Sequence, residues 1–289
     1  MSWFALSLGA AVTQAAQFAV VKARAQGIPV LVIVASNQTV AVTAWLIFFV
    51  VTGRSVAMPD GRAWVAIVVS AIFVAVMNGL LARASSRGDI SIVGAVFALS
   101  PVFTVIPDAV LSGTLPSPLG WLGLALAVTG TVTLAGGAGV VGRLRALFAR
   151  RDALDALGAA ILLGIVASID RWGALALGPP TYLLYSHGVT AALAGSLALA
   201  TTPTGVRAGF RPANLMTLVG HGLLGVTGTG LQTTALTSAP AAYVNAVRRV
   251  SAVIAVVLGS TLFREPDPGR RLAAALLACL GAACLLLAR

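Results

Sequence analysis

The sequence predicts an all-α integral membrane protein of ten transmembrane helices, arranged as two inverted five-helix repeats. Three observations lead to this fold class. The first is composition, because 58% of the 289 residues are hydrophobic and only 9% are charged, whereas a soluble domain has about 25% charged residues. The second is a succession of ten apolar segments separated by short connections rich in Gly, Pro and Arg. The third is an internal match between the two halves of the chain.

The first five segments are expected to cross the bilayer, since a crossing needs about 20 helical residues. No basic stretch precedes the first segment, and Lys22 and Arg24 follow it at once, so we expect a retained span and not a cleaved signal peptide. The fifth segment is short and is expected to tilt little or to lie in a thinned region. These spans are residues 3–21, 29–51, 62–82, 91–112 and 119–136.

The last five segments repeat this pattern after a connection that is too short for a soluble domain. The ninth contains Arg248 and Arg249. The apolar run after them, 250–263, cannot cross a bilayer alone. The span must therefore include both arginines near mid-membrane, where each costs about 2.5–3.5 kcal/mol on insertion scales. The expected spans are residues 154–175, 181–200, 215–234, 239–263 and 272–288.

The two halves match without a gap over residues 62–134 and 213–285, at a shift of 151 positions. Because matches between Ala, Val and Leu arise by chance in this composition, the Gly and Ser matches weigh more. Each half then holds five spans, and an odd number inverts the second copy relative to the membrane. We predict one repeat at residues 1–138 and the other at residues 152–289. The matched pairs include Gly79 with Gly230, Ser100 with Ser251, and Gly130 with Gly281.

The net charge of +11 is concentrated in the loops. Of the 19 basic residues, 13 follow odd-numbered spans and four lie on the other side. The positive-inside rule places the odd-numbered loops in the cytoplasm and both termini on the opposite, outer side of the plasma (inner) membrane. Because these charges do not form one basic face, we expect a lipid bilayer and no nucleic acid as partner.

The run YVNAVRRVSAVIAVVLGSTLFREP, residues 243–266, resembles the ninth-span signature of the drug/metabolite transporter (DMT) superfamily, in its EamA branch. In that family the span ends in a Gly, two or three apolar residues and a Glu, and a final span with a Gly-apolar-Gly pattern follows. The first half carries the family's Ser-Pro-apolar pattern but has Thr114 at the position of Glu265. The matching residues are Ser100, Pro101, Gly259, Leu262, Glu265 and Gly281.

This resemblance covers the whole chain as two EamA-like repeats. It implies a secondary transporter, usually an exporter, that moves a small organic metabolite or drug across the plasma membrane by alternating access. The expected partners are a small-molecule substrate and a coupling proton or cation, and the chain is expected to be a monomer or a homodimer.

Two other functions remain open. One is a flippase for a lipid-linked sugar or phospholipid, in which Arg248 and Arg249 would hold a phosphate. The other is a membrane scaffold without transport. A cavity open to one face favours a carrier, a lateral opening to lipid favours a flippase, and a dry, packed interior favours a scaffold.

The sequence carries no enzymatic pattern. It has no HExxH motif and no phosphate loop, so we expect no enzyme and no metal or cofactor site. Its two cysteines, Cys279 and Cys284, lie five positions apart in the last span and are interpreted as packing residues.

Charged residues inside the spans are the first candidates for a substrate cavity. Asn245, Arg248 and Arg249 fall at i, i+3 and i+4 on one helix face, and either meet an anionic group or form a structural ion pair or a snorkelling arrangement. Asp170, next to Arg171, is the most deeply placed acid. It is either a coupling site for a proton or cation or the charge partner of an arginine. We predict that it approaches Arg248 or Arg249 across the sixth and ninth spans.

Neutral polar residues complete the candidate cavity. Each alone could be a packing residue that bonds between helices for about 0.6 kcal/mol. Their recurrence in equivalent spans of both halves favours a pore lining for the set. The set is Gln14, Gln17, Asn37, Asn78, His187, His221 and Gln232.

Overall fold

The computed structural model describes residues 2–25, 27–97, 99–113, 115, 117–134, 149–263 and 268–287, and every regular element within them is a helix. The motif positions Thr114 and Glu265 lie outside these ranges. Six helical segments among the described residues are long and apolar enough to cross a membrane. They are α1 (Trp3–Arg24), α2 (Val30–Thr52), α3 (Gly61–Arg87), α8 (Arg151–Leu177), α9 (Pro179–Thr201) and the segment Ala241–Leu262.

The all-helical prediction is therefore confirmed. The segment Ala241–Leu262 consists of two helices, α12 (Ala241–Arg248) and α13 (Ser251–Leu262). The other helices are α4 (Ile90–Phe97), α5 (Ser100–Ser112), α6 (Pro118–Leu134), α10 (Pro203–Gly209), α11 (Pro212–Leu236) and α14 (Pro268–Leu287).

Two spans that the sequence predicts as single helices are divided in the structure. Residues 91–112 form α4 and α5, and residues 239–263 form α12 and α13. At each junction the hydrogen bonding tightens to a 3₁₀ pattern, since the amides of Leu99 and Val250 both bond to the carbonyl three residues back, at 3.1 Å. Hydropathy alone cannot reveal such a break, because apolar residues continue through it.

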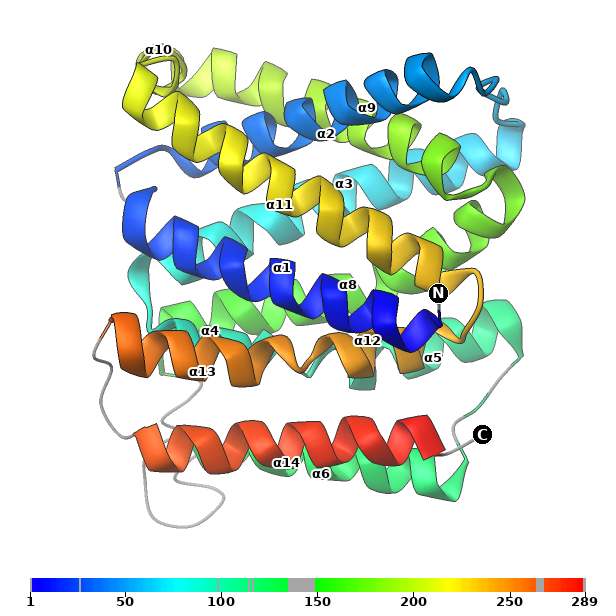
Figure 1. Ribbon diagram of the computed structural model, residues 1–289, viewed down its shortest axis with the longest axis vertical. Helices are drawn as coiled ribbons and strands as arrows, with labels where there is room; N and C mark the ends of the chain where they lie inside the picture. Colours follow the sequence, from blue (N-terminus) through cyan, green and yellow to red (C-terminus); the bar gives the residue numbers. More distant parts are fainter. Residues whose placement is uncertain are drawn as a thin grey trace.

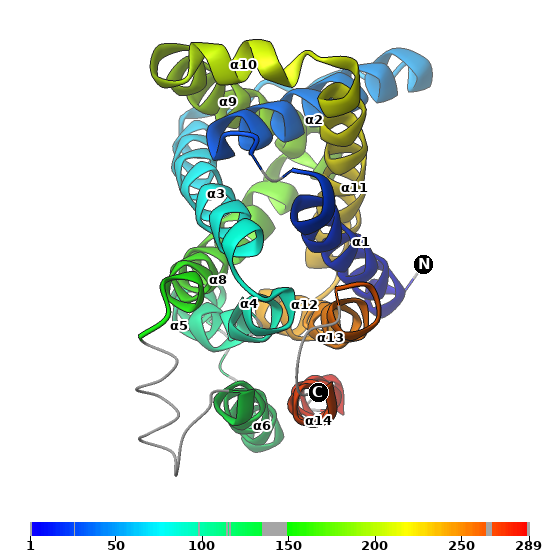
Figure 2. The same ribbon diagram turned by 90° about the vertical axis from the view of Figure 1, so that its left-hand side faces the viewer.

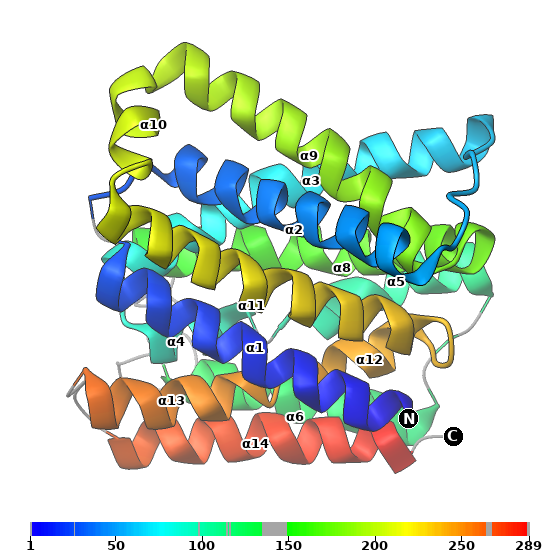
Figure 3. The same cartoon turned by 45° about the horizontal axis from the view of Figure 1, so that its top comes forward.

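The two halves of the chain interleave. In Figure 1, α3 of the first half packs on α8 of the second, and α1 packs on α11. Figure 2 shows α6 and α14 side by side, beyond the layer that contains α4, α5, α12 and α13. Figure 3 shows α11 between α1 and α2, with α9 against α2. Each half therefore covers its apolar faces mainly with helices of the other.

Glycine permits the closest of these approaches. A Cβ atom at Gly164 of α8 would lie 2.6 Å from the backbone carbonyl carbon of Phe103 in α5. One at Gly222 of α11 would lie 2.6 Å from the Cβ of Val40 in α2. Small residues are the usual means of close helix packing within membranes, so these positions fix the distances between neighbouring helices.

We expect Gly164→Ala to destabilise the protein by about 1–3 kcal/mol, because a methyl group must push the α5 backbone away. Gly220→Ala is the matched control, since no atom lies within 4 Å of its Cβ position. The control should be neutral or gain about 0.5–1 kcal/mol of helix propensity. Unfolding of both variants in one detergent measures the difference, and equal stabilities would contradict the close α5–α8 approach.

Candidate functional site

Two adjoining cavities lie between helices of both halves of the chain. Their volumes are about 30 and 70 Å³. Both are lined by Gln14 and Gln17 of α1, Asn37 of α2, and Asn78 and Leu81 of α3. The larger one also receives side chains from α8, α9, α11 and α12. We call the two together the central cavity.

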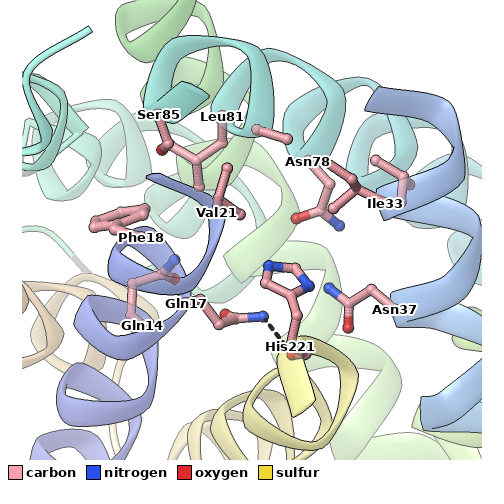
Figure 4. A pocket seen from close by; sticks show the side chains of 12 residues that line it. Gln14, Gln17, Phe18, Val21, Ile33, Asn37, Asn78, Leu81, Ser85 and His221 are labelled. Carbon is pink, nitrogen blue, oxygen red and sulfur yellow. Dashed lines mark hydrogen bonds between the residues drawn. The ribbon is translucent and has the colours of Figure 1, made fainter. Parts of the chain in front are cut away.

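The smaller cavity is polar on one side and apolar on the other. In Figure 4 the side chains of Gln17, Asn37, Asn78 and His221 point toward one another, with Phe18 on the far wall. Gln17 Nε2 donates to the backbone carbonyl of His221 at 3.3 Å. This group of amides and an imidazole can donate and accept hydrogen bonds, as a polar solute requires.

Arg248 enters the larger cavity from α12 and is only 5% exposed. Its Nη1 donates to Oε1 of Gln232, and its Nη2 donates to Oε1 of Gln14 at 2.6 Å. Gln14 belongs to the first half of the chain and Gln232 to the second. The guanidinium group therefore links the two halves, and its bonded partners are neutral amides.

Gln232 belongs to a hydrogen-bonded chain with a single direction. Its Nε2 donates to Oδ1 of Asn245 at 3.5 Å, and Nδ2 of Asn245 donates to Oγ1 of Thr104 at 2.9 Å. The Thr104 hydroxyl donates to the Ser100 carbonyl at 2.9 Å. Each amide thus turns its oxygen toward Arg248, and these dipoles stabilise the guanidinium charge without a carboxylate. Asn245 does not line the cavity but holds Gln232 in position.

Arg249 bonds at the junctions of the two divided helices. Pro101 has no N–H for the Phe97 carbonyl four residues before it, and Nη1 of Arg249 donates to that carbonyl at 3.1 Å. The Arg249 amide bonds to Ala246 instead of Asn245, and its Nε donates to the Asn245 carbonyl at 3.1 Å. Its guanidinium carbon lies 4.6 Å from the Phe97 ring centroid, within cation–π range. Arg249 therefore fastens α12 to α4 and does not line the central cavity.

Asp170 lines the larger cavity from α8 and is held by two hydroxyl groups. Ser70 Oγ and Tyr182 OH both donate to its Oδ1 at 2.7 Å. Among the ion pairs of the described residues, none joins Asp170 to Arg248 or Arg249. The predicted approach of Asp170 to Arg248 is present as an electrostatic attraction and not as an ion pair, because hydroxyls hold the acid and amides hold the arginine. Asp170 and Arg248 instead line one cavity, each with its own partners.

Arg171, the neighbour of Asp170, makes a different ion pair. Its Nη1 lies 3.9 Å from Oδ1 of Asp108 in α5. Asp108 is buried and also accepts from the Ala242 amide, at the start of α12, at 3.5 Å. This pair ties α8 to α5 and α12 outside the cavity lining. Within the described part of the chain, no three His, Cys, Asp or Glu side chains are arranged to hold a metal ion.

His187 of α9 links three helices beside the larger cavity. Its Nδ1 bonds to Oε1 of Gln38 in α2, and its Nε2 lies 3.3 Å from Oγ1 of Thr229 in α11. Because an amide oxygen only accepts, Nδ1 carries the proton in this arrangement. The ring is buried and lines the cavity, so packing and cavity lining are combined in one residue.

The structure gathers most of the candidate residues in one place. The residues that line the central cavity are Gln14, Gln17, Asn37, Asn78, Asp170, His187, His221, Gln232 and Arg248. Asn245 and Arg249 stand behind this lining.

Sequence reasoning missed several polar residues around the cavity. Ser70 and Thr229 could not be told apart from hydroxyl residues that merely bond to their own helix. Tyr182 gave a usable signal, because the chain has only three tyrosines and a buried phenol needs a hydrogen-bond partner.

Comparison with known protein families gives a match over the first part of the chain. The model of the EamA-like transporter family matches residues 1–136. Residues 1–136 are therefore similar to that family. The resemblance to the DMT superfamily is thereby confirmed, and together with the long apolar helices it indicates a multi-pass membrane protein of the transporter class. No curated protein matches the chain.

Solved structures show a likeness of fold over nearly the whole chain. Among 27 matching chains, one titled "Crystal structure of protein" has a TM-score of 0.70 and 19% sequence identity. The match covers 99% of this chain and 95% of that chain. The two proteins therefore share a fold over nearly their full lengths.

We expect Tyr182→Phe to lower the stability of the protein by about 1–3 kcal/mol, because Asp170 loses one of its two hydroxyl donors. Tyr185→Phe is the matched control, since its hydroxyl lies 3.5 Å from Sδ of the exposed Met58 and should contribute almost nothing. Thermal unfolding of both variants in the same detergent makes the comparison. A Tyr182→Phe protein as stable as the control would show that Asp170 does not depend on this bond.

Proposed function

We propose that the chain is a secondary transporter, an exporter that moves a small organic metabolite or drug across the plasma (inner) membrane by alternating access. The observation that carries the proposal is the central cavity, which lies between helices of both halves and is lined by amides, imidazoles, one acid and one arginine. A packed scaffold gains nothing from polar groups at this depth, where they are costly. A carrier needs them to replace the water around its solute.

The proposal includes ten spans in two inverted repeats, residues 1–138 and 152–289. The packing of α3 on α8 and of α1 on α11 supports it, since α3 corresponds to α11 and α1 to α8. In Figure 1, α2 runs opposite to α9 and α6 opposite to α14.

The divided helices support the same repeat. Phe97 ends α4 and Arg248 ends α12, while Ser100 begins α5 and Ser251 begins α13. Both pairs are 151 positions apart, which is the shift that aligns the two halves of the sequence. A break at the same place in both copies is expected if the repeats descend from one five-helix unit.

An apolar groove is relevant to the flippase alternative, because a flippase needs a lateral opening to lipid. The groove has a volume of about 1140 Å³ and lies between α2, α3 and α9, with Arg83 among its lining residues. Among the residues that the structure describes, none lines both this groove and the central cavity. A lipid headgroup would need a path from one to the other, so the separation favours a carrier of a small solute.

The coupling ion is assigned to the central cavity as well. Asp170 is the acid among the cavity-lining residues, and intramembrane acids are the usual carriers of a coupling proton or cation. Its hydroxyl partners, Ser70 and Tyr182, come from α3 and α9. A change in its protonation would therefore reach helices of both halves.

Alternating access predicts that one position in the cavity can be reached from both sides of the membrane. In a background with Cys279→Ala and Cys284→Ala, we expect Asn78→Cys to react with an impermeant methanethiosulfonate in both right-side-out and inside-out vesicles. Ala71→Cys is the control, because Ala71 is fully buried on the same helix, and it should react from neither side. Labelling of Asn78→Cys from one side only, or from neither, would argue against a carrier.

The same reagent tests the orientation. The basic connections that follow α1, α3 and α10 lie at one end of the helices in Figure 1, and the proposal places them in the cytoplasm. Ala149, exposed next to Arg150 and Arg151, belongs to the basic connection after α6. We expect Ala149→Cys to react in inside-out vesicles and to stay unlabelled on intact cells. Labelling on intact cells would reverse the assignment.

A further inference from the structure

The central cavity contains a guanidinium group that forms no ion pair with an acid among the described residues. Arg248 is the arginine that lines it, and its bonded partners are the neutral oxygens of Gln14 and Gln232. Its buried Nε has no partner among the described residues. The acid of the cavity, Asp170, is held by Ser70 and Tyr182 and makes no ion pair with Arg248 in the described part of the chain.

This arrangement leaves N–H donors of the guanidinium group free. A guanidinium group has five N–H donors, and the amides of Gln14 and Gln232 occupy two of them. Asp170 attracts the guanidinium group across the cavity, but no hydrogen bond joins the two among the described residues. The remaining donors form a planar fork that fits a carboxylate through two parallel bonds.

We propose that the substrate of this transporter carries a single carboxylate group and that Arg248 binds this group inside the larger cavity. The inference rests on the proposed function, because it names the substrate class of the same cavity. The other charged lining group, Asp170, repels a second negative charge. Arg248 in turn repels a substrate whose only charge is an amine.

The position of Arg249 decides between a carboxylate and a phosphate. A phosphate group carries a charge of about −1.5 to −2 at neutral pH and would call on both arginines. Arg249 is committed to the carbonyls of Phe97 and Asn245 and lies outside the cavity lining. Arg248 remains available to the substrate, and its single positive charge matches the single negative charge of a carboxylate.

The hydrogen-bonded chain behind Arg248 holds the fork in place. Thr104 fixes Asn245, Asn245 fixes Gln232, and the oxygen of Gln232 accepts from Nη1 of Arg248. Gln14 holds Nη2 from the opposite half of the protein. Asn245 and Gln232 are therefore positioning residues for carboxylate binding, and movement of the two halves changes the distance between the arginine's two supports.

Transport of matched compounds by the full chain in proteoliposomes tests the inference. Three labelled sets serve as probes: propionate, benzoate and indole-3-acetate, each with its primary amide and the corresponding amine. In at least one set we expect uptake of the acid to exceed that of the amide by about tenfold or more, because a buried charged donor rejects an analogue without the complementary group. The amine should show the least uptake.

Variants at Arg248 locate the selectivity. Arg248→Gln should remove the preference for the acid over the amide, and Arg248→Lys should keep the preference with lower acid uptake, because lysine cannot form the two parallel bonds. Arg54→Gln, at an exposed position just beyond the end of α2, is the control and should behave as wild type. If Arg248→Gln does not fold, the selectivity of the wild type and of Arg248→Lys still tests whether Arg248 binds the carboxylate.

Two outcomes would overturn the inference. One is equal uptake of acid and amide in every set, including no uptake of any acid. The other is an acid preference that survives in Arg248→Gln. Accessibility of Asn78→Cys separates this failure from failure of the proposed function. If Asn78→Cys is labelled from both sides and an amide or amine is transported, the protein is a carrier but its substrate is not a carboxylate. Labelling from one side only would contradict the proposal that the protein is a carrier.

Discussion

The structure depends on one constraint, which is that polar groups at mid-membrane must find partners within the protein because lipid offers none. Pro101 leaves the Phe97 carbonyl without its helical donor, and the tightened turn of the second junction releases the Asn245 carbonyl. Arg249 donates to both. One side chain thus satisfies a carbonyl of α4 and a carbonyl of α12, while its own buried charge gains two oxygen partners and an aromatic face.

Two adjacent arginines therefore have different tasks. Successive residues of a helix point about 100° apart, so one helix cannot direct both side chains to the same place. Arg248 faces the central cavity, and Arg249 faces the junction of α4 and α5. Of these two costly arginines, Arg248 therefore lies where a solute can bind, and Arg249 stabilises the breaks in the helices.

Neutral partners give the cavity its chemical character. Had Asp170 and Arg248 formed an ion pair, each would have occupied hydrogen-bonding groups of the other. Instead, amides support the arginine and hydroxyls support the acid. Because the supports of each group come from both halves of the chain, rearrangement of the halves alters the electrostatics of the cavity. That link between packing and charge is what a carrier driven by alternating access requires.

The sequence by itself predicted the helices and placed Arg248 and Arg249 inside an apolar segment. Length and hydropathy suffice for these, since a bilayer crossing imposes a minimum apolar length. It also pointed to polar residues such as Gln14, Asn78 and His221, because amides and imidazoles inside apolar spans are conspicuous. The all-helical class and the family of residues 1–136 agree with that analysis.

Only the tertiary structure decided which polar groups meet. The partners of Arg248 are 234 and 16 positions away, and the Ser70 partner of Asp170 is 100 positions away. Such pairs depend on how helices cross and on which glycines allow them to approach, neither of which hydropathy records. The helix junctions escaped the sequence for a related reason. A 3₁₀ turn changes hydrogen bonding without changing polarity, and Arg249 offsets the cost by donating to a carbonyl at each junction.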